Sequence, residues 1–295
     1  MAQLKVSMTK IHFIGMGKMG LPMATHLAKN FNDISVSDVS DVSLKRAVQQ
    51  GLSVVDVREG LQKAEVVISS LPNDEALQTV ALELATHAQP GTLFIDTSTV
   101  SVKVSEHVAD VLDAQGIFYL RCPVSGNSQM AESAQLTALA SGPRQAYELA
   151  QPLLKVFGPF QFYLGGNEQA RVMKLIINLL VVQTFSALGE GLSIGEASGL
   201  DWEQMWQVIA SSAVASPLLK VKSGSLSQRD FTSTFSVSQM QKDLYLIQEQ
   251  ANRCGLNALH TNIAEQELSR VAMAGRSGDD YACIVELNHR RIGEG

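Results

Sequence analysis

The chain has 295 residues, 45% of them hydrophobic and 18% charged, which is enough for a sizeable core and suits two domains better than one. Its formal net charge of -6, without any basic run, argues against nucleic acid and anionic membranes as partners. Three cysteines without a CxxC pair and six histidines without an HExxH argue against a disulfide framework and against a metal site.

The first half of the chain alternates short apolar runs with helix-like stretches. The apolar runs predict strands at residues 11–14, 34–38, 66–71, 92–96, 117–120 and 136–140. Helices are expected between most of them, for example at residues 21–30 and 74–88. Such alternation is typical of βαβ units, whose right-handed crossovers place helices on both faces of a parallel sheet.

The pattern changes near Gly165 and Gly166, after which no comparable strand is predicted. Long helices are expected at residues 168–198, 202–212, 237–254 and 257–274. The sequence therefore predicts an α/β fold in which a parallel-sheet domain at residues 1–164 is followed by an all-α domain at residues 165–295.

Neither an export signal nor a membrane span is predicted. The first ten residues contain no long apolar stretch. No run of eighteen uninterrupted apolar residues occurs, because Asn178 and Gln183 interrupt the longest apolar stretch, which follows Lys174. The unpaired cysteines favour a reducing compartment, so we expect a cytoplasmic protein that acts on small molecules.

A glycine-rich loop follows the first predicted strand directly and precedes a helix with Pro22 in its first turn. The loop reads Gly15-Met16-Gly17-Lys18-Met19-Gly20. A plain βα turn can also carry glycines, but this GxGxxG in this context favours a dinucleotide-binding loop on a Rossmann-type domain. Gly15 permits the tight turn, Gly17 the approach of a pyrophosphate, and Gly20 the close packing of helix on strand. The first N–H groups of the helix then face the phosphates.

Asp38 lies eighteen residues past Gly20, at the end of the next predicted strand. An acid at this place can bind the ribose hydroxyls and repel a 2′-phosphate, which favours NAD over NADP. Lys45 and Arg46 lie farther along, so NADP stays possible.

Lys174 and Asn178 are four residues apart on a predicted helix and therefore share one face. Such pairs are common on helix surfaces, and spacing alone favours a solvated lysine and amide. Oxidation of a hydroxyl to a carbonyl needs a group that takes the hydroxyl proton. A partly buried lysine with a lowered pKa can take that proton and return it in reduction, while Asn178 orients the lysine or binds the substrate.

Ser125, Gly126 and Asn127 follow Pro123 in a predicted loop. Their backbone N–H groups and the Ser125 hydroxyl can hold a carboxylate. All of these residue types also favour turns, so composition alone favours a plain turn.

Segments along nearly the whole chain resemble the β-hydroxyacid dehydrogenase family, which includes 3-hydroxyisobutyrate dehydrogenases and tartronate semialdehyde reductases. The resemblance starts from the cofactor signature at residues 15–27. Its further segments, in the family's order, are Leu71-Pro72-Asn73-Asp74, Asp96-Thr97-Ser98-Thr99, Pro123-Val124-Ser125-Gly126, Lys174 with Asn178, Lys242-Asp243-Leu244 and Asp280-Tyr281-Ala282.

The resemblance implies hydride transfer between a nicotinamide cofactor and a small 3-hydroxy acid or its semialdehyde, with Lys174 as general acid and base. It implies a substrate-binding loop around Ser125 and a homodimer or homotetramer. It also implies cofactor contacts from Leu71, Pro72, Thr99 and Lys242, although a solvated charge is the alternative for Lys242.

The chain departs from the family pattern around the expected substrate pocket. Arg121-Cys122 stand where the family has Asp-Ala, and the other departures are Asn127, Met130, Ala134 and Ile177. Exchange of Asp for Arg reverses a charge, so we expect a substrate that differs from 3-hydroxyisobutyrate, for example by a second acidic or polar group. Arg121 can bind a carboxylate of such a substrate with two N–H groups, or it can pair with a nearby acid on the surface. The sequence leaves both roles open.

Two other functions stay open. A reductase of another small carbonyl or of an imine can use the same scaffold, although Lys174 favours hydroxy-acid chemistry because the imine-reducing relatives replace that lysine. A non-catalytic dinucleotide-binding protein is the second alternative. Such a protein is expected to lose Lys174 or the glycines first, and this chain keeps both.

Overall fold

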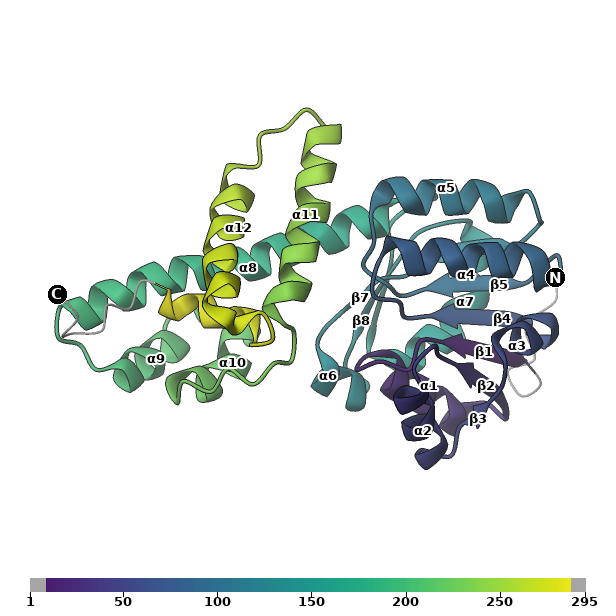
Figure 1. The fold of residues 1–295 in the computed structure, drawn as a ribbon, viewed down its shortest axis with the longest axis horizontal. Helices are drawn as coiled ribbons and strands as arrows, with labels where there is room; N and C mark the ends of the chain where they lie inside the picture. Colours follow the sequence, from purple (N-terminus) through teal and green to yellow (C-terminus); the bar gives the residue numbers. More distant parts are fainter. Residues whose placement is uncertain (1–8, 288–295) are drawn as a thin grey trace. The chain divides into compact units, whose positions relative to one another are not determined.

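The computed structural model describes residues 9–287, so most of the segment for which no signal peptide is predicted lies outside the described residues. The chain divides into a sheet unit, Met1–Leu175, and a helical unit, Ile176–Gly295 (Figure 1). This division falls inside one long helix, α8 (Gln169–Ala197). The domain boundary predicted after residue 164 stays a prediction.

The sheet unit contains a six-stranded parallel sheet in the order β3-β2-β1-β4-β5-β6. Its strands are β1 (Lys10–Ile14), β2 (Asp33–Ser37), β3 (Ser53–Val54), β4 (Val66–Ser69), β5 (Leu93–Asp96) and β6 (Phe118–Arg121). Five of them match predicted strands, and β3 has only two residues, too few for a pattern. The strand order reverses between β1 and β4, where doubly wound sheets bind their ligands.

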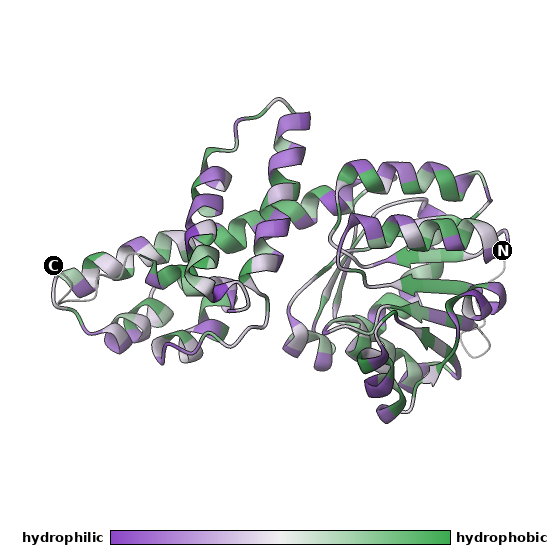
Figure 2. Cartoon of the chain, viewed as in Figure 1, coloured by the Kyte–Doolittle hydropathy of each residue, from purple (hydrophilic) through white to green (hydrophobic). Residues whose placement is uncertain are grey.

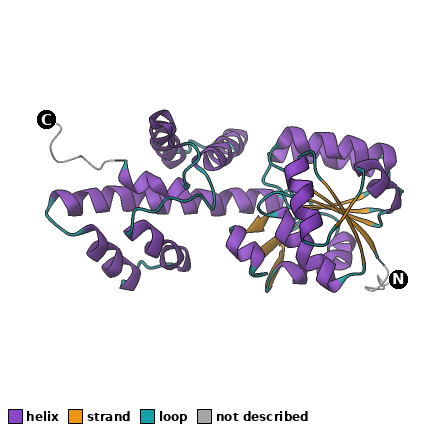
Figure 3. Cartoon of the chain, turned by 60° about the horizontal axis from the view of Figure 1, so that its bottom comes forward, coloured by secondary structure: helices purple, strands orange, loops and turns teal. Residues whose placement is uncertain are grey.

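Helices cover both faces of this sheet (Figure 3). They are α1 (Gly20–Asn30), α2 (Asp41–Gln49), α3 (Val57–Lys63), α4 (Asp74–His87), α5 (Val102–Asp113) and α7 (Arg144–Phe157). Alternate strand residues enter opposite cores, as the pleat requires. Val66 and Ile68 pack with α1 and α7, whereas Val67 between them packs with α3, α4 and α5. The apolar runs are therefore continuous because both faces are covered.

A second, three-stranded sheet follows in the order β7-β8-β9. Its strands are β7 (Val124–Ser125), β8 (Thr137–Ala140) and β9 (Phe160–Tyr163), and α6 (Ser128–Glu132) lies between the first two. The strand predicted at residues 136–140 is thus β8, antiparallel to β7 rather than part of the parallel sheet. β7 is too short to predict, and alternate residues of β9 are exposed.

In the helical unit, α8 is followed by α9 (Trp202–Ser211), α10 (Pro217–Ser227), α11 (Val237–Arg253), α12 (Leu259–Val271) and two short helices, Ala272–Arg276 and Tyr281–Glu286. Within residues 9–287 no strand follows β9, as predicted. The unpredicted helix, α10, begins at Pro217 after the capping residue Ser216. Only Leu219 and Leu226 of α10 are buried, which leaves little apolar periodicity to recognise.

By length and composition alone, α8 is apolar enough to cross a membrane, the one such helix in the described part of the chain (Figure 2). A core helix of a soluble protein meets the same criteria, so this is weak evidence. One face of α8 is covered by the helical unit itself, since Val182, Phe185 and Leu192 are buried. The ring of Phe185 meets the edge of Tyr281, with centroids 5.4 Å apart.

Candidate active site

Four predicted cofactor segments begin at one edge of the parallel sheet. Ile14, the last residue of β1, is in register with Ser37 of β2 and with Ser69 of β4. Ser69 is in register with Asp96, the last residue of β5. Because these carboxyl ends are neighbours, the loops that carry the glycines, Asp38, Leu71 and Thr99 start side by side.

The three glycines have different surroundings that match their predicted roles. Gly15 has a φ of 97°, and a Cβ there would lie 2.3 Å from the Ser70 carbonyl oxygen. A Cβ on Gly20 would lie 1.8 Å from the carbonyl oxygen of Gly15, so helix and loop touch. A Cβ on Gly17 would meet nothing within 4 Å. Gly17 is therefore not required by contacts of the protein itself, and its open side fits a close-lying pyrophosphate.

The first turn of α1 also fits an anionic ligand. No side chain caps its N-terminus, whereas Asn73 caps α4 and Ser101 caps α5. Lys18 and Met19 of the loop immediately precede this turn. N–H groups at such an end, with the positive end of the helix dipole, bind phosphate.

Asp38 directly follows β2 and is held by two backbone N–H groups. Met16 donates to its Oδ2 at 2.6 Å, and Ser40 donates to its Oδ1 at 2.7 Å. Asp38 thus fixes the glycine loop through Met16, while each carboxylate oxygen keeps a further lone pair for a ribose hydroxyl. The neighbouring Val39 is fully exposed.

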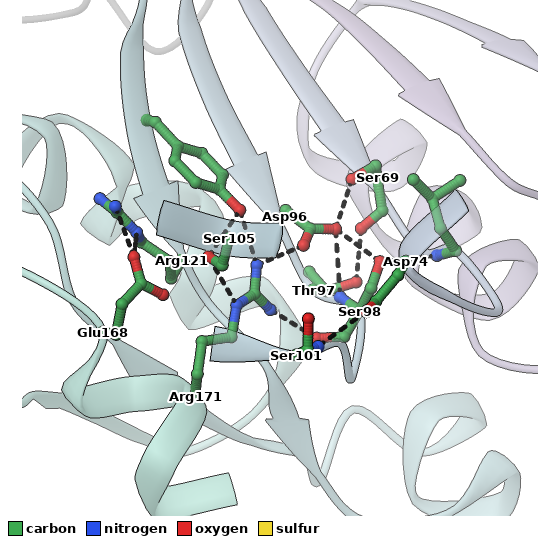
Figure 4. Close-up of polar contacts among 12 residues, drawn as sticks. Ser69, Asp74, Asp96, Thr97, Ser98, Ser101, Ser105, Arg121, Glu168 and Arg171 are labelled. Carbon is green, nitrogen blue, oxygen red and sulfur yellow. Dashed lines mark hydrogen bonds and ion pairs between the residues drawn. The ribbon is translucent and has the colours of Figure 1, made fainter. Parts of the chain in front are cut away.

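The loops after β4 and β5 are joined by a buried hydrogen-bond network around Asp96 (Figure 4). Oδ1 of Asp96 accepts from the hydroxyls of Ser69 at 2.6 Å and Ser98 at 2.5 Å. The backbone N–H of Leu71 donates to the Ser98 hydroxyl at 2.8 Å, and Thr97 donates to the Ser69 carbonyl at 2.6 Å. This network holds the predicted cofactor segments around Leu71 and Thr99 against each other.

Arg171, in the first turn of α8, completes this network and was not predicted. Its guanidinium pairs with Oδ2 of Asp96 and donates to the Ser98 carbonyl oxygen. It also donates to the Tyr119 hydroxyl at 2.8 Å and to Ser105 at 3.3 Å. Burial lowers the pKa of Arg171, but the hydrogen bond to Tyr119 and the charge of Asp96 raise this pKa by more, so the guanidinium stays charged. Burial raises the pKa of Tyr119, which therefore stays a neutral phenol.

Lys174 and Asn178 both lie on α8 and are buried, with exposed fractions of 9% and 5%. Lys174 comes one turn after Arg171. Asn178 donates from Nδ2 to Oδ2 of Asp243 at 2.5 Å, and Nζ of Lys242 lies 2.8 Å from the other oxygen of Asp243. Asp243 of α11, for which the sequence predicts no chemical role, thus connects Asn178 with Lys242 inside the helical unit.

Arg121, at the end of β6, is buried and paired with Glu168. Its Cζ also lies over the Tyr119 ring, 4.5 Å from the centroid. The sequence leaves two roles open for Arg121, binding a substrate or pairing with an acid on the surface. The structure pairs Arg121 with an acid, but this acid is buried. Contact of Arg121 with a substrate stays a prediction.

The loop predicted to bind a carboxylate begins in β7. Ser125 is half-buried there, and Gly126 has a φ of 141° with its Cβ position only 2.6 Å from a methyl carbon of Leu136. Asn127 caps α6, because its side chain accepts from the N–H of Met130 at 2.9 Å. The side chain that replaces a family glycine therefore starts a helix. Whether these residues bind a substrate stays a prediction.

The described residues contain no group of three or more His, Cys, Asp or Glu side chains that could hold a metal ion. All three cysteines are free thiols, and Cys122 and Cys283 are buried. Burial raises the pKa of Cys122 to about 12 and that of Cys283 to about 12, so neither is a reactive thiolate near neutral pH.

Residues 10–166 match the family model described as the NAD-binding domain of 6-phosphogluconate dehydrogenase. Residues 169–288 match the one described as NAD-binding of NADP-dependent 3-hydroxyisobutyrate dehydrogenase. The chain is 29% identical to a 3-hydroxyisobutyrate dehydrogenase of Pseudomonas aeruginosa, over 95% of this chain and 98% of that one. It is 28% identical, over the same shares, to an NAD-dependent L-serine dehydrogenase of that organism. A structure of Mycobacterium tuberculosis 3-hydroxyisobutyrate dehydrogenase with L-serine is similar at a TM-score of 0.87 and 25% identity, covering 96% of this chain and all of that one.

Proposed function

Because this chain belongs to the β-hydroxyacid dehydrogenase family, we propose that Lys174 is the general acid and base of its reaction. The chain is an NAD(P)-dependent oxidoreductase of small hydroxy acids or their semialdehydes. The observation that supports the role of Lys174 is its burial on α8, one turn after the arginine that binds the loop following β5. A lysine held in this way has a defined position relative to that loop.

In the proposed oxidation the hydroxy acid loses a hydride from carbon and a proton from oxygen. NAD, when bound, would supply the acceptor for a hydride from the carbon that carries the hydroxyl group. The neutral amine of Lys174 takes the hydroxyl proton, and the electron pair of the broken O–H bond forms the carbonyl bond. In reduction the ammonium group returns this proton to the oxygen. Asn178, fixed by Asp243, orients the lysine or the substrate oxygen.

We assign the cofactor to the carboxyl edge of the parallel sheet. The glycine loop and the first turn of α1 hold the pyrophosphate, and Asp38 holds the adenosine ribose, which makes NAD the preferred cofactor. The nicotinamide half lies along the loops after β4 and β5, and its predicted contacts are Leu71, Pro72, Thr99 and Lys242. This assignment is supported by the hydrogen bonds through Ser98 and Asp96, which hold the loops after β4 and β5 together.

The substrate is proposed to be a small hydroxy acid whose carboxylate binds at Ser125 and Gly126. Two similar proteins are named for compounds of this kind, 3-hydroxyisobutyrate and L-serine, and both carry a carboxylate and a hydroxyl group. Asn127 and Arg121 border this segment and are the positions at which specificity for another substituent is expected.

We further propose that the chain forms a homodimer or homotetramer through α8. Its face opposite the buried one exposes Ile176, Leu180 and Ile194, with exposed fractions of 44%, 62% and 62%. A stripe of this kind on a long apolar helix is covered when a second copy packs on it. Light scattering gives the mass in solution, and Leu180→Glu should lower it to that of a monomer.

We propose a cytoplasmic location because the cysteines are not joined in disulfides. All three are free, including the exposed Cys254, which suits a reducing compartment.

The proposed role of Lys174 is tested with purified protein, NAD and a panel of small hydroxy acids and aldehydes, following the absorbance of the reduced cofactor. Lys174→Ala should lower kcat by about two to four orders of magnitude while NAD still binds. Lys174→Arg should not restore turnover, because arginine does not release its proton near neutral pH. Lys155→Ala, at an exposed position of α7, is the matched control and should leave kcat unchanged. Near-normal turnover by Lys174→Ala would contradict the mechanism.

A further inference from the structure

Arg171 is buried to 1% exposure although it carries a positive charge, and the reaction described above gives it no role. A buried guanidinium is costly unless every donor is engaged. Its N–H groups donate to four residues from three separate segments. These are Asp96 and Ser98 at and just after the end of β5, Ser105 on α5, and Tyr119 on β6. Such a concentration of bonds at one helix turn fixes the position of that turn.

The same guanidinium reaches both loops that are expected to flank the nicotinamide. It binds the Ser98 carbonyl oxygen directly (Figure 4). Ser98 in turn accepts, through its hydroxyl, the N–H of Leu71 in the loop after β4. Arg171 is therefore two hydrogen bonds away from Leu71 and one from the residue next to Thr99.

On the helix side, Arg171 and Lys174 are three residues apart and so lie on the same face, one turn apart. A rotation or shift of the first turn of α8 would move Lys174 with it, because the helix is continuous through both residues. The contacts of Arg171 therefore constrain the position of the first turn of α8, and of Lys174 with it, relative to the loop after β5.

We propose that Arg171 is a positioning residue that holds Lys174 at a fixed place relative to the nicotinamide-side loops. This inference rests on the proposed role of Lys174 as the proton-transfer group. The arginine touches neither substrate nor cofactor in this role. Its planar fork suits it, since several fixed donors can bind a carboxylate, a carbonyl and a hydroxyl at once, whereas a lysine ammonium is a point charge on a flexible stem.

The test compares Arg171→Lys with the wild-type chain. The lysine keeps a positive charge beside Asp96 but cannot bind Asp96, Ser98 and Tyr119 together. We expect kcat to fall at least tenfold while KM for the hydroxy acid and the Kd of NAD, measured by fluorescence titration, change less than fivefold. A fall confined to kcat indicates misplacement of the proton-transfer group. Retention of kcat within threefold would overturn the proposal.

Tyr119→Phe is the second variant, because it removes one acceptor of Arg171 and keeps the ring. We expect a smaller loss of kcat in the same direction, and if Arg171→Lys does not fold, an unchanged kcat in Tyr119→Phe overturns the proposal. Leu154→Ala is the control for general loosening, since Leu154 is a fully buried residue of α7 in the same unit. An equal loss of kcat in Leu154→Ala, assayed where it is folded, would also overturn it.

A readout apart from turnover separates this proposal from the proposed function. The rate at which acetic anhydride modifies Lys174 relative to the exposed Lys155 is measured by mass spectrometry. We expect Arg171→Lys to change this ratio at least threefold, and an unchanged ratio counts against the positioning role. If Lys174→Ala kept its turnover, the proposed function would fail, while the acetylation ratio would still report on the position of Lys174.

Discussion

Arg121 donates from Nε to one oxygen of Glu168 at 2.6 Å, and its Nη2 lies 2.6 Å from the same oxygen. The other oxygen of this carboxylate is buried without a hydrogen-bond partner among the described residues. The pair joins the end of β6 to the residue just before α8, with both side chains 8% exposed. A buried pair of this kind is strongly destabilising when only one partner is removed.

We therefore expect Arg121→Ala to lower the free energy of unfolding by about 3–5 kcal/mol. Glu168→Ala should have a similar effect, and the double variant should lose less than the sum, because neither charge is then left unpaired. Chemical denaturation measures all three. If Arg121→Lys instead kept its stability and raised KM for an acidic substrate at least tenfold, about 1.4 kcal/mol, Arg121 would be a substrate ligand.

The glycine loop offers a matched pair of substitutions. Gly17→Ala should leave thermal stability unchanged, since its Cβ meets nothing, but should weaken NAD binding at least tenfold because the methyl group occupies the space of the pyrophosphate. Gly20→Ala should destabilise the folded chain even without NAD, because its Cβ would overlap the Gly15 carbonyl. Thermal unfolding and NAD titration separate the two effects. Equal loss of stability in both variants would contradict the assignment of Gly17 to the ligand.

Cofactor choice is expected to depend on Asp38 and its exposed neighbour Val39. The wild-type chain should have a higher kcat/KM with NAD than with NADP, because the carboxylate repels a 2′-phosphate. Val39→Arg should shift this ratio toward NADP by about tenfold or more without a stability cost, since the valine packs against nothing. A clear preference of the wild-type chain for NADP would show that Asp38 does not set the choice.

His12 predicts a pH dependence of stability. It is fully buried in β1 between the hydroxyls of Ser35 and Ser37, and burial lowers its pKa from 6.5 to about 4. The unfolded chain then binds a proton that the folded chain does not between these two values. The contribution of His12 to the free energy of unfolding is therefore fully present above pH 6.5. It falls by up to about 3 kcal/mol as the pH drops toward 4. Urea unfolding measures this dependence, and the free energy of unfolding of His12→Gln should fall less between pH 6.5 and 4 than that of the wild-type chain. An identical pH profile in both chains would rule out His12 as the source of the dependence.

The parallel sheet and its loops were predictable because their signals are local. A buried strand, a glycine turn and a helix start follow one another within residues 11–30, and each needs only near neighbours in sequence to be recognised. The same holds for Asp38 at the end of β2. Their positions relative to each other follow from the parallel register.

The surroundings of Lys174 were not predictable in this way. Arg171 binds Asp96, seventy-five residues earlier, and Asn178 binds Asp243, sixty-five residues later. No local pattern marks such partners. No local pattern indicates that the Asn127 side chain caps α6, because this helix has only five residues and shows no periodicity.

The bond between Arg171 and Asp96 also has a consequence for how much chain is needed to fold the nucleotide-binding half. Asp96 ends a central strand and is completely buried, but its only guanidinium partner in the described chain is Arg171 of α8. A fragment that stopped at residue 164 would bury this carboxylate without a counter-charge. We therefore expect the sheet half to reach its final packing only after residue 171 has been synthesised, and a separately expressed nucleotide-binding fragment to need the start of α8.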